Sequence, residues 1–214
     1  MRKIIPTVFE NNKKEFDKRY SKLIKLDRGL QIDFMDGKFV KAKGIELKDV
    51  PNLIKYKMQF EAHLMVMNPE KWISELKMKG FFKVIFHGES KKNNSDIDKI
   101  IKLIKNSKMK AWIAINPDTG INKIMSFLKK IDGVLFMGVY PGREKQKFVN
   151  SVLGKIKKLR KLNKKIKIQI DGGVNLETIG KLKKAGVDYV NSGSFVSGAE
   201  YPKRALKELE ERFR

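Results

Sequence analysis

The chain has 214 residues, and 41% of them are hydrophobic, so it can form one domain with a substantial core and is no disordered tail. It contains no cysteine, which excludes disulfides, thiolate metal sites and cysteine nucleophiles. The 48 basic and 24 acidic residues give a formal net charge of +24. Forty of the cations are lysines spread along the chain without arginine–aromatic clusters. We interpret them as a solvated surface that attracts anionic small molecules, with no specific nucleic-acid partner.

Targeting signals are not evident at the N-terminus. Residues 1–6 lack an apolar signal region and a cleavage site, and the chain has no run of about 18 apolar residues. We therefore expect a cytoplasmic protein without a membrane partner.

Short β-rich segments alternate with amphipathic helical segments along the whole chain. The expected strands are residues 3–8, 30–34, 59–66, 82–87, 110–115, 133–139, 166–170 and 187–191. Between them lie apolar stripes at spacings of three and four, such as Ile97, Ile100, Ile101 and Ile104, or Phe148, Val152, Ile156 and Leu159. Gly44 and Pro51 limit segment 41–56 to a short helix, and the last helix is expected to start near Ala199.

Eight strand–helix repeats in 214 residues predict the α/β class and a single (β/α)8 TIM barrel domain over residues 1–214. A doubly wound open sheet needs only five or six repeats. In such barrels the active site lies at the carboxyl ends of the strands, so polar residues at those ends are the candidates for function.

Four expected strands end in polar or ionisable side chains. Gln31 and Asp33 share one face of the second strand, because side chains alternate along a strand. His63, His87 and Asp171 lie at the ends of the third, fourth and seventh strands. One histidine at a strand end is commonly structural, but four such ends on one rim indicate an active site.

The order and spacing of several motifs resemble the ribulose-phosphate 3-epimerase family over nearly the whole chain. The matching segments are residues 33–40 (DFMDGKFV), 62–65 (AHLM), 68–70 (NPE), 86–89 (FHGE), 116–117 (NP), 141–142 (PG), 146–148 (QKF) and 171–175 (DGGVN). The resemblance implies an isomerase of the pentose phosphate pathway that interconverts D-ribulose 5-phosphate and D-xylulose 5-phosphate. It also implies that Asp33 and Asp171 exchange the proton at C3.

In that family two histidines and two aspartates hold one divalent metal ion, often zinc. The resemblance carries Asp33, His63 and Asp171 over as ligands, whereas Gln31 stands where the family has its first histidine. An amide oxygen is a weaker ligand than imidazole, so we expect a weakened site with Gln31 or water as fourth ligand, or a preference for a harder metal. Zn, Mn, Fe, Co and Mg all remain candidates. Alternatively, Gln31 marks a chain whose chemistry has changed.

Substrate contacts follow from the same resemblance. They are assigned to Thr7, Met35, Met65, His87, Met137, Gly142, Arg143, Gly172, Gly173, Gly193 and Ser194. The glycines after the seventh and eighth strands are expected to form a phosphate cradle at the barrel rim. The family's Gly-Phe-Gly-Gly turn reads Gly-Arg-Glu-Lys at 142–145, so Arg143 or Lys145 is expected to replace lost backbone contacts.

Three other functions remain open. The first is an epimerase acting on another ketose phosphate. For any of these functions the chain can form a homo-oligomer, a state that the sequence does not decide. The second is an enzyme of the orotidylate decarboxylase group, which is disfavoured because Met35 stands where the Asp-x-Lys-x-x-Asp signature of that group has lysine. The third is a catalytically silent barrel that binds phosphate or polyanions, motivated by Gln31, the altered turn and the charge.

Overall fold

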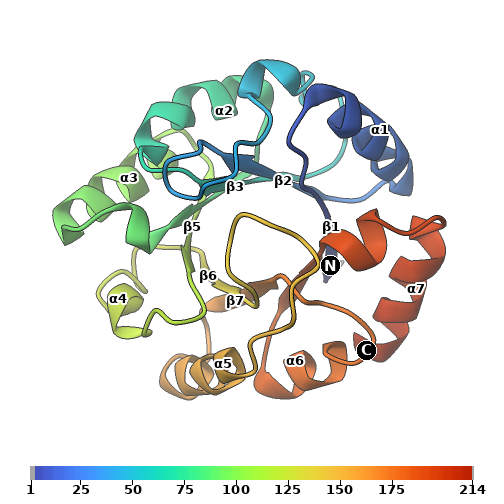
Figure 1. Cartoon of the computed structure of the whole chain (residues 1–214). Coiled ribbons are helices and arrows are strands. Elements are labelled where there is room, and N and C mark those ends of the chain that lie inside the picture. Colours follow the sequence, from blue (N-terminus) through green and yellow to red (C-terminus); the bar gives the residue numbers. More distant parts are fainter. Residues whose placement is uncertain (1–2, 214) are drawn as a thin grey trace.

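A computed structural model describes residues 3–213 of the chain. Eight parallel strands follow one another in chain order and close into a barrel, with the helices packed around the outside (Figure 1). The predicted α/β class and (β/α)8 barrel are thus confirmed.

The strands lie close to their expected positions. They are β1 (Ile4–Val8), β2 (Leu30–Met35), β3 (Phe60–Met65), β4 (Lys83–His87), β5 (Lys110–Ile115), β6 (Gly133–Met137), β7 (Lys167–Asp171) and β8 (Tyr189–Ser192). Each agrees with its expected strand to within two residues at either end. Alternating or continuous apolar runs between turn residues were therefore sufficient to locate all eight.

The helices cover the outer face of the barrel. They are α1 (Lys13–Leu23), α2 (Ile73–Lys79), α3 (Asn94–Asn106), α4 (Asn122–Met125), α5 (Ser151–Leu162), α6 (Ile179–Ala185) and α7 (Pro202–Phe213). The short helix expected in segment 41–56 is one turn at Leu47–Asp49. The last helix starts at Pro202 rather than near Ala199, because a separate turn at Gly193–Ser197 precedes it and proline is favoured at a helix start. Among residues 3–213, no helix is both long and apolar enough to cross a bilayer.

Two apolar layers hold these elements together. The outer layer lies between strands and helices and includes the predicted α3 stripe of Ile97, Ile100, Ile101 and Ile104, all buried. In α5, Val152, Ile156 and Leu159 are buried, and Phe148 packs beside them at partial exposure. The inner layer lies inside the barrel and consists of Ile5, Ile85, Trp112, Ala114, Leu135, Met137 and Tyr189.

The barrel interior also contains a set of buried polar side chains. They are Gln31, Asp33, Glu61, His63, Lys83, His87, Gln169, Asp171 and Asn191. Most of them come from β2, β3, β7 and β8. A polar column inside a barrel is stable only if its members satisfy one another's hydrogen bonds, so their pairing determines the site described below.

Gly133 provides a test of the apolar packing inside the barrel. A Cβ added there would lie 2.5 Å from ring atoms of Trp112, whereas a Cβ added at Gly154 in α5 meets no atom within 4 Å. We expect Gly133→Ala to lower the free energy of unfolding by about 1–3 kcal/mol through overpacking. The control Gly154→Ala should raise it by about 0.5–1 kcal/mol through helix propensity. Urea denaturation measures both, and equal stabilities of the two variants would contradict this packing.

Candidate active site

The carboxyl ends of β2, β3 and β7 bring three ionisable side chains together. Asp33 and His63 are register partners on adjacent strands, and Asp171 is the last residue of β7. All three are buried. Strands β2 and β7 are three positions apart around the ring, so the two carboxylates approach the axis from different sides.

These three side chains form one compact group. Nδ1 of His63 lies 3.0 Å from Oδ1 of Asp33 and 3.4 Å from Oδ2 of Asp171. One potential ligand atom from each residue lies within 4.8 Å of the others. Two carboxylate oxygens and one imidazole nitrogen are a donor set that suits a divalent cation with a coordination position left for substrate. Asp33, His63 and Asp171 therefore fit the expected metal site.

Gln31 lies beneath this group with its amide nitrogen toward it. Nε2 donates hydrogen bonds to Oδ1 of Asp33 (2.9 Å) and Oδ2 of Asp171 (2.6 Å). Its Oε1 accepts a hydrogen bond from Nδ2 of Asn191 at 2.9 Å. In this orientation the amide oxygen is turned away from the three-residue group. A ligand role for Gln31 stays a prediction that requires its amide to rotate.

Burial and mutual contact shift the pKa values in the group. Burial, reinforced by the charge of Asp171, raises the pKa of Asp33 to about 6 against the hydrogen bonds from His63 and Gln31. Burial lowers the pKa of His63, but the hydrogen bonds to Asp171 and Asp33 outweigh it and raise the value to about 9. Burial lowers the pKa of His87. The group therefore combines carboxylates with an imidazole that favours its charged form.

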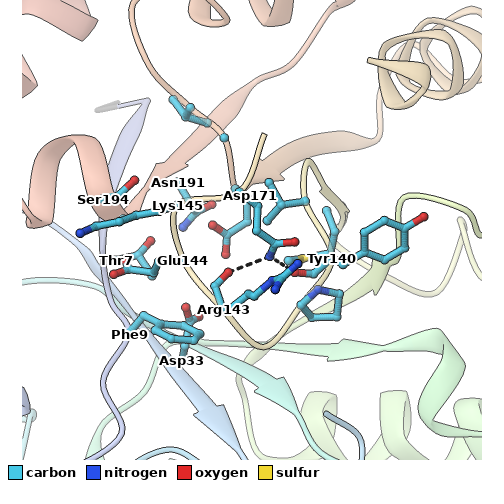
Figure 2. A pocket seen from close by; sticks show the side chains of 18 of the residues that line it. Thr7, Phe9, Asp33, Tyr140, Arg143, Glu144, Lys145, Asp171, Asn191 and Ser194 are labelled. Carbon is cyan, nitrogen blue, oxygen red and sulfur yellow. Dashed lines mark hydrogen bonds between the residues drawn. The ribbon is translucent and has the colours of Figure 1, made fainter. Parts of the chain in front are cut away.

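A cleft of about 330 Å³ opens above the group. The loop between β6 and α5 crosses the barrel mouth above it (Figure 1), and Figure 2 shows side chains that line the cleft. The predicted site residues that line it are Thr7, Asp33, His63, Met65, Met137, Gly142, Arg143, Asp171, Gly172, Gly173, Gly193 and Ser194. The structure thus brings most of the predicted residues together.

Three predicted site residues do not line this cleft. Gln31 lies below it, as described above. His87 lies behind His63, with the two Nε2 atoms 3.0 Å apart and the rings stacked. Met35 faces a neighbouring hollow beside Gly44. Direct substrate contacts by His87 and Met35 stay predictions.

Thr7 supplies a polar atom on the β1 side of the cleft (Figure 2). Its Oγ1 is buried and has no hydrogen-bond partner within residues 3–213. Since a buried hydroxyl without a partner costs free energy, this atom is suited to contact a bound polar ligand.

The expected phosphate cradle lies at the ends of β7 and β8. Gly172 and Gly173 adopt φ values of 93° and 68°, which favour glycine, and a Cβ at Gly172 would lie 2.4 Å from Val139. At Gly193 an added Cβ would lie 2.7 Å from Oε1 of Glu144. The Glu144 carboxylate, held by Arg19 at 3.0 Å, therefore stands against the cradle.

Two functional candidates were missed in the sequence. Asn191 lines the cleft and holds Gln31, and Glu144 stands against the cradle. Asn191 could have been found, because it shares the inward face of its strand with Tyr189. The position of Glu144 has no such signal, because it depends on how an irregular loop folds back over the barrel.

The structure is a closed (β/α)8 barrel with a carboxylate–histidine–carboxylate group at the carboxyl ends of its strands. This is where (β/α)8-barrel enzymes have their active sites. A sequence profile described as the Ribulose-phosphate 3 epimerase family matches residues 3–197. The chain belongs to this family and is an isomerase of the epimerase class.

Individual relatives agree with this assignment. The chain is 35% identical over 188 residues to a protein of Mycobacterium leprae named ribulose-phosphate 3-epimerase, covering 86% of this chain and 83% of the relative. A protein of the same name from Schizosaccharomyces pombe is 30% identical over 212 residues, with 97% and 92% covered. A crystal structure of 3-hexulose-6-phosphate synthase superposes with a TM-score of 0.72 at 18% identity, covering 99% of this chain and all of the other, which shows the shared barrel fold.

Glu144 yields a prediction about anion binding. Its carboxylate at the cradle repels a phosphate, so Glu144→Ala should lower the Kd for inorganic phosphate by about two- to fivefold, or about 0.5–1 kcal/mol. The control Glu211→Ala removes the same charge from an exposed position on α7 and should leave Kd unchanged. Phosphate titrations by calorimetry measure both. A Kd that rises in Glu144→Ala would show that this carboxylate supports the cradle.

Proposed function

We propose that this chain is a ribulose-phosphate 3-epimerase that interconverts D-ribulose 5-phosphate and D-xylulose 5-phosphate. The observation that carries the proposal is the meeting of Asp33 and Asp171, from strands three positions apart, at one cleft. The names of the Mycobacterium leprae and Schizosaccharomyces pombe relatives support the same substrates.

Inversion at C3 needs two acid/base groups on opposite faces of the carbon. In the proposed reaction, one ionised aspartate removes the C3 proton and leaves an enediolate. The other aspartate, protonated at the start, delivers its proton to the opposite face of C3. The two groups end with their protonation states exchanged and return to the starting state through exchange with water. The burial that raises the pKa of Asp33 helps one carboxyl group to hold a proton.

Asp33, His63 and Asp171 would hold a divalent cation at this site. When bound, such a cation supplies positive charge that stabilises the enediolate oxygens. The side chains of Met65 and Met137 line the cleft beside the carboxylates, where they limit access of water to the reacting carbons. The metal identity stays open.

The remaining contacts complete the proposal. Gly172, Gly173, Gly193 and Ser194 would hold the substrate phosphate, and Thr7 would contact a polar group nearer the barrel axis. Arg143 and Lys145 line the cleft from the overlying loop and would add positive charge. A single domain over residues 1–214, of which 1–2 and 214 lie outside the described part, stays a prediction, as do a homo-oligomer and a cytoplasmic location.

The two aspartates provide the main test of the mechanism. We expect Asp33→Asn and Asp171→Asn each to lower kcat for epimerisation by about 100-fold or more, since each removes one acid/base group. The matched control Asp49→Asn lies outside the cleft, in the turn Leu47–Asp49, and should retain wild-type turnover. Near wild-type turnover by either active-site variant would remove that residue from the acid/base role.

Isotope exchange tests the same mechanism in the wild-type enzyme. Because the abstracted proton and the delivered proton belong to different carboxyl groups, product formed in deuterium oxide should carry deuterium at C3. Mass spectrometry and proton NMR of the recovered sugar phosphate measure it. Product without deuterium at C3 would contradict the two-aspartate mechanism.

The proposed cation site is tested by replacing Gln31. Gln31→His adds an imidazole to the donor set, so we expect Zn²⁺ to bind about 10-fold more tightly or better. His63→Ala removes one of three ligands and should weaken binding relative to wild type. Chelation followed by elemental analysis and Zn²⁺ titration gives the order of affinities. Full epimerase activity in exhaustively chelated, metal-free wild type would overturn the cation proposal.

A further inference from the structure

A continuous chain of buried hydrogen bonds runs along the barrel interior from its amino-terminal end to the active site. Its members, in order, are Glu61 with Lys83, then Gln169, Asn191, Gln31, and finally Asp33 with Asp171. The three amide side chains in the middle are completely buried. Each amide has a donor end and an acceptor end, so the hydrogen bonds of this series that lead from Lys83 to the two aspartates all run in one direction, from donor to acceptor.

The ion pair at the lower end determines how Gln169 is oriented. Nζ of Lys83 lies 2.6 Å from Oε1 of Glu61 and donates to Oε1 of Gln169 at 2.8 Å. Nε2 of Gln169 donates to Oε2 of Glu61 at 2.8 Å. An amine of lysine offers donors to an amide oxygen, and a carboxylate only accepts, so the opposite orientation of Gln169 would lose both contacts.

That orientation passes to the active site through Asn191. Nε2 of Gln169 also donates to Oδ1 of Asn191, which leaves Nδ2 of Asn191 to donate to Oε1 of Gln31. Gln31 must then present Nε2 to Asp33 and Asp171. Turning Gln31 alone would place its oxygen against two carboxylates and its NH2 group against that of Asn191.

We propose that Asn191 and Gln169 are positioning residues, which hold Gln31 as a hydrogen-bond donor to both active-site carboxylates and so keep its oxygen from becoming a fourth cation ligand. The part concerning the cation rests on the proposed function. The two carboxylates are thereby bridged by a neutral donor whose direction is fixed at the far end of the barrel. Neither Gln169 nor the Lys83–Glu61 pair lines the cleft.

The orientation is tested directly by neutron diffraction from perdeuterated, chelated wild-type crystals. We expect two deuterium atoms on the Gln31 side-chain atom that faces Asp33 and Asp171, and two on the Asn191 atom that faces Gln31. Deuterium on the opposite side of the Gln31 amide would overturn the proposal. This readout is independent of activity and of any cation.

The consequence for the site is tested with Mn²⁺ as the probe. Asn191→Leu removes the group that holds the Gln31 oxygen, so Gln31 becomes able to turn that oxygen toward a bound cation. We expect Mn²⁺ to bind about 10-fold more tightly to this variant than to wild type. Residues that hydrogen-bond to metal ligands typically change metal affinity by about this factor. Gln169 lies one hydrogen bond further from Gln31, so Gln169→Leu should also tighten Mn²⁺ binding, but by a smaller factor. The control Ser192→Ala changes the neighbouring residue of β8, which takes no part in this series of hydrogen bonds. This variant should bind Mn²⁺ as tightly as wild type does.

A double variant separates this effect from general loosening of the site. In the Gln31→Leu background, Asn191→Leu should no longer change Mn²⁺ affinity, because no amide oxygen remains to turn. Tightening that persists there, or an unchanged or weaker affinity in folded Asn191→Leu, would overturn the positioning role. Asn191→Ser, whose hydroxyl is too short to bridge the gap, carries the same test if the leucine variant does not fold. Failure of every variant and wild type to bind Mn²⁺ would overturn the cation site itself, whatever the neutron result.

Discussion

The structure depends on placing two carboxylates close together inside a barrel. Asp33 and Asp171 are buried, and the desolvation of ionised carboxylates costs more than hydrophobic packing nearby can offset unless donors face them. His63 supplies one donor to the pair and the Gln31 amide supplies two hydrogen bonds. The amide side chains below the pair hold the Gln31 donor in place through their own hydrogen bonds.

The same requirement explains why the barrel interior contains a set of polar side chains beside an apolar one. Strands β5 and β6 contribute apolar side chains to the interior, and the Trp112 ring packs against Gly133, where a side chain would not fit. Elsewhere in the interior, amide side chains fill space while satisfying each other's hydrogen bonds. Nζ of Lys83 contacts both the apolar and the polar set, since it lies 4.0 Å from the centroid of the Trp112 ring and pairs with Glu61. Tight apolar packing and a directed network of polar side chains thus share the barrel interior.

The sequence was sufficient for the fold and for most of the residues that gather at the mouth, and it was insufficient for their mutual orientation. Strand positions follow from apolar periodicity. Gln31 and Asp33 are predicted to point into the same side of the sheet because side chains alternate along a strand. Which end of the Gln31 amide faces the carboxylates depends on Asn191, which is 160 residues away in the chain. The position of Glu144 against Gly193 depends on an irregular loop, for which local sequence preferences are weak.

Glutamine at position 31 separates two tasks that a ligating histidine at the same position would perform together. A histidine there would coordinate a cation, and the cation would neutralise the carboxylates. Gln31 instead bridges the carboxylates through its own NH2 group, so the acidic pair is stabilised before any cation arrives. Proton exchange at carbon requires the two carboxyl groups to stay close with different protonation states, and a neutral donor is compatible with either state of each. The proposed acid/base pair is therefore physically compatible with a cation site that has three ligands, and Gln31 by itself does not make the barrel silent.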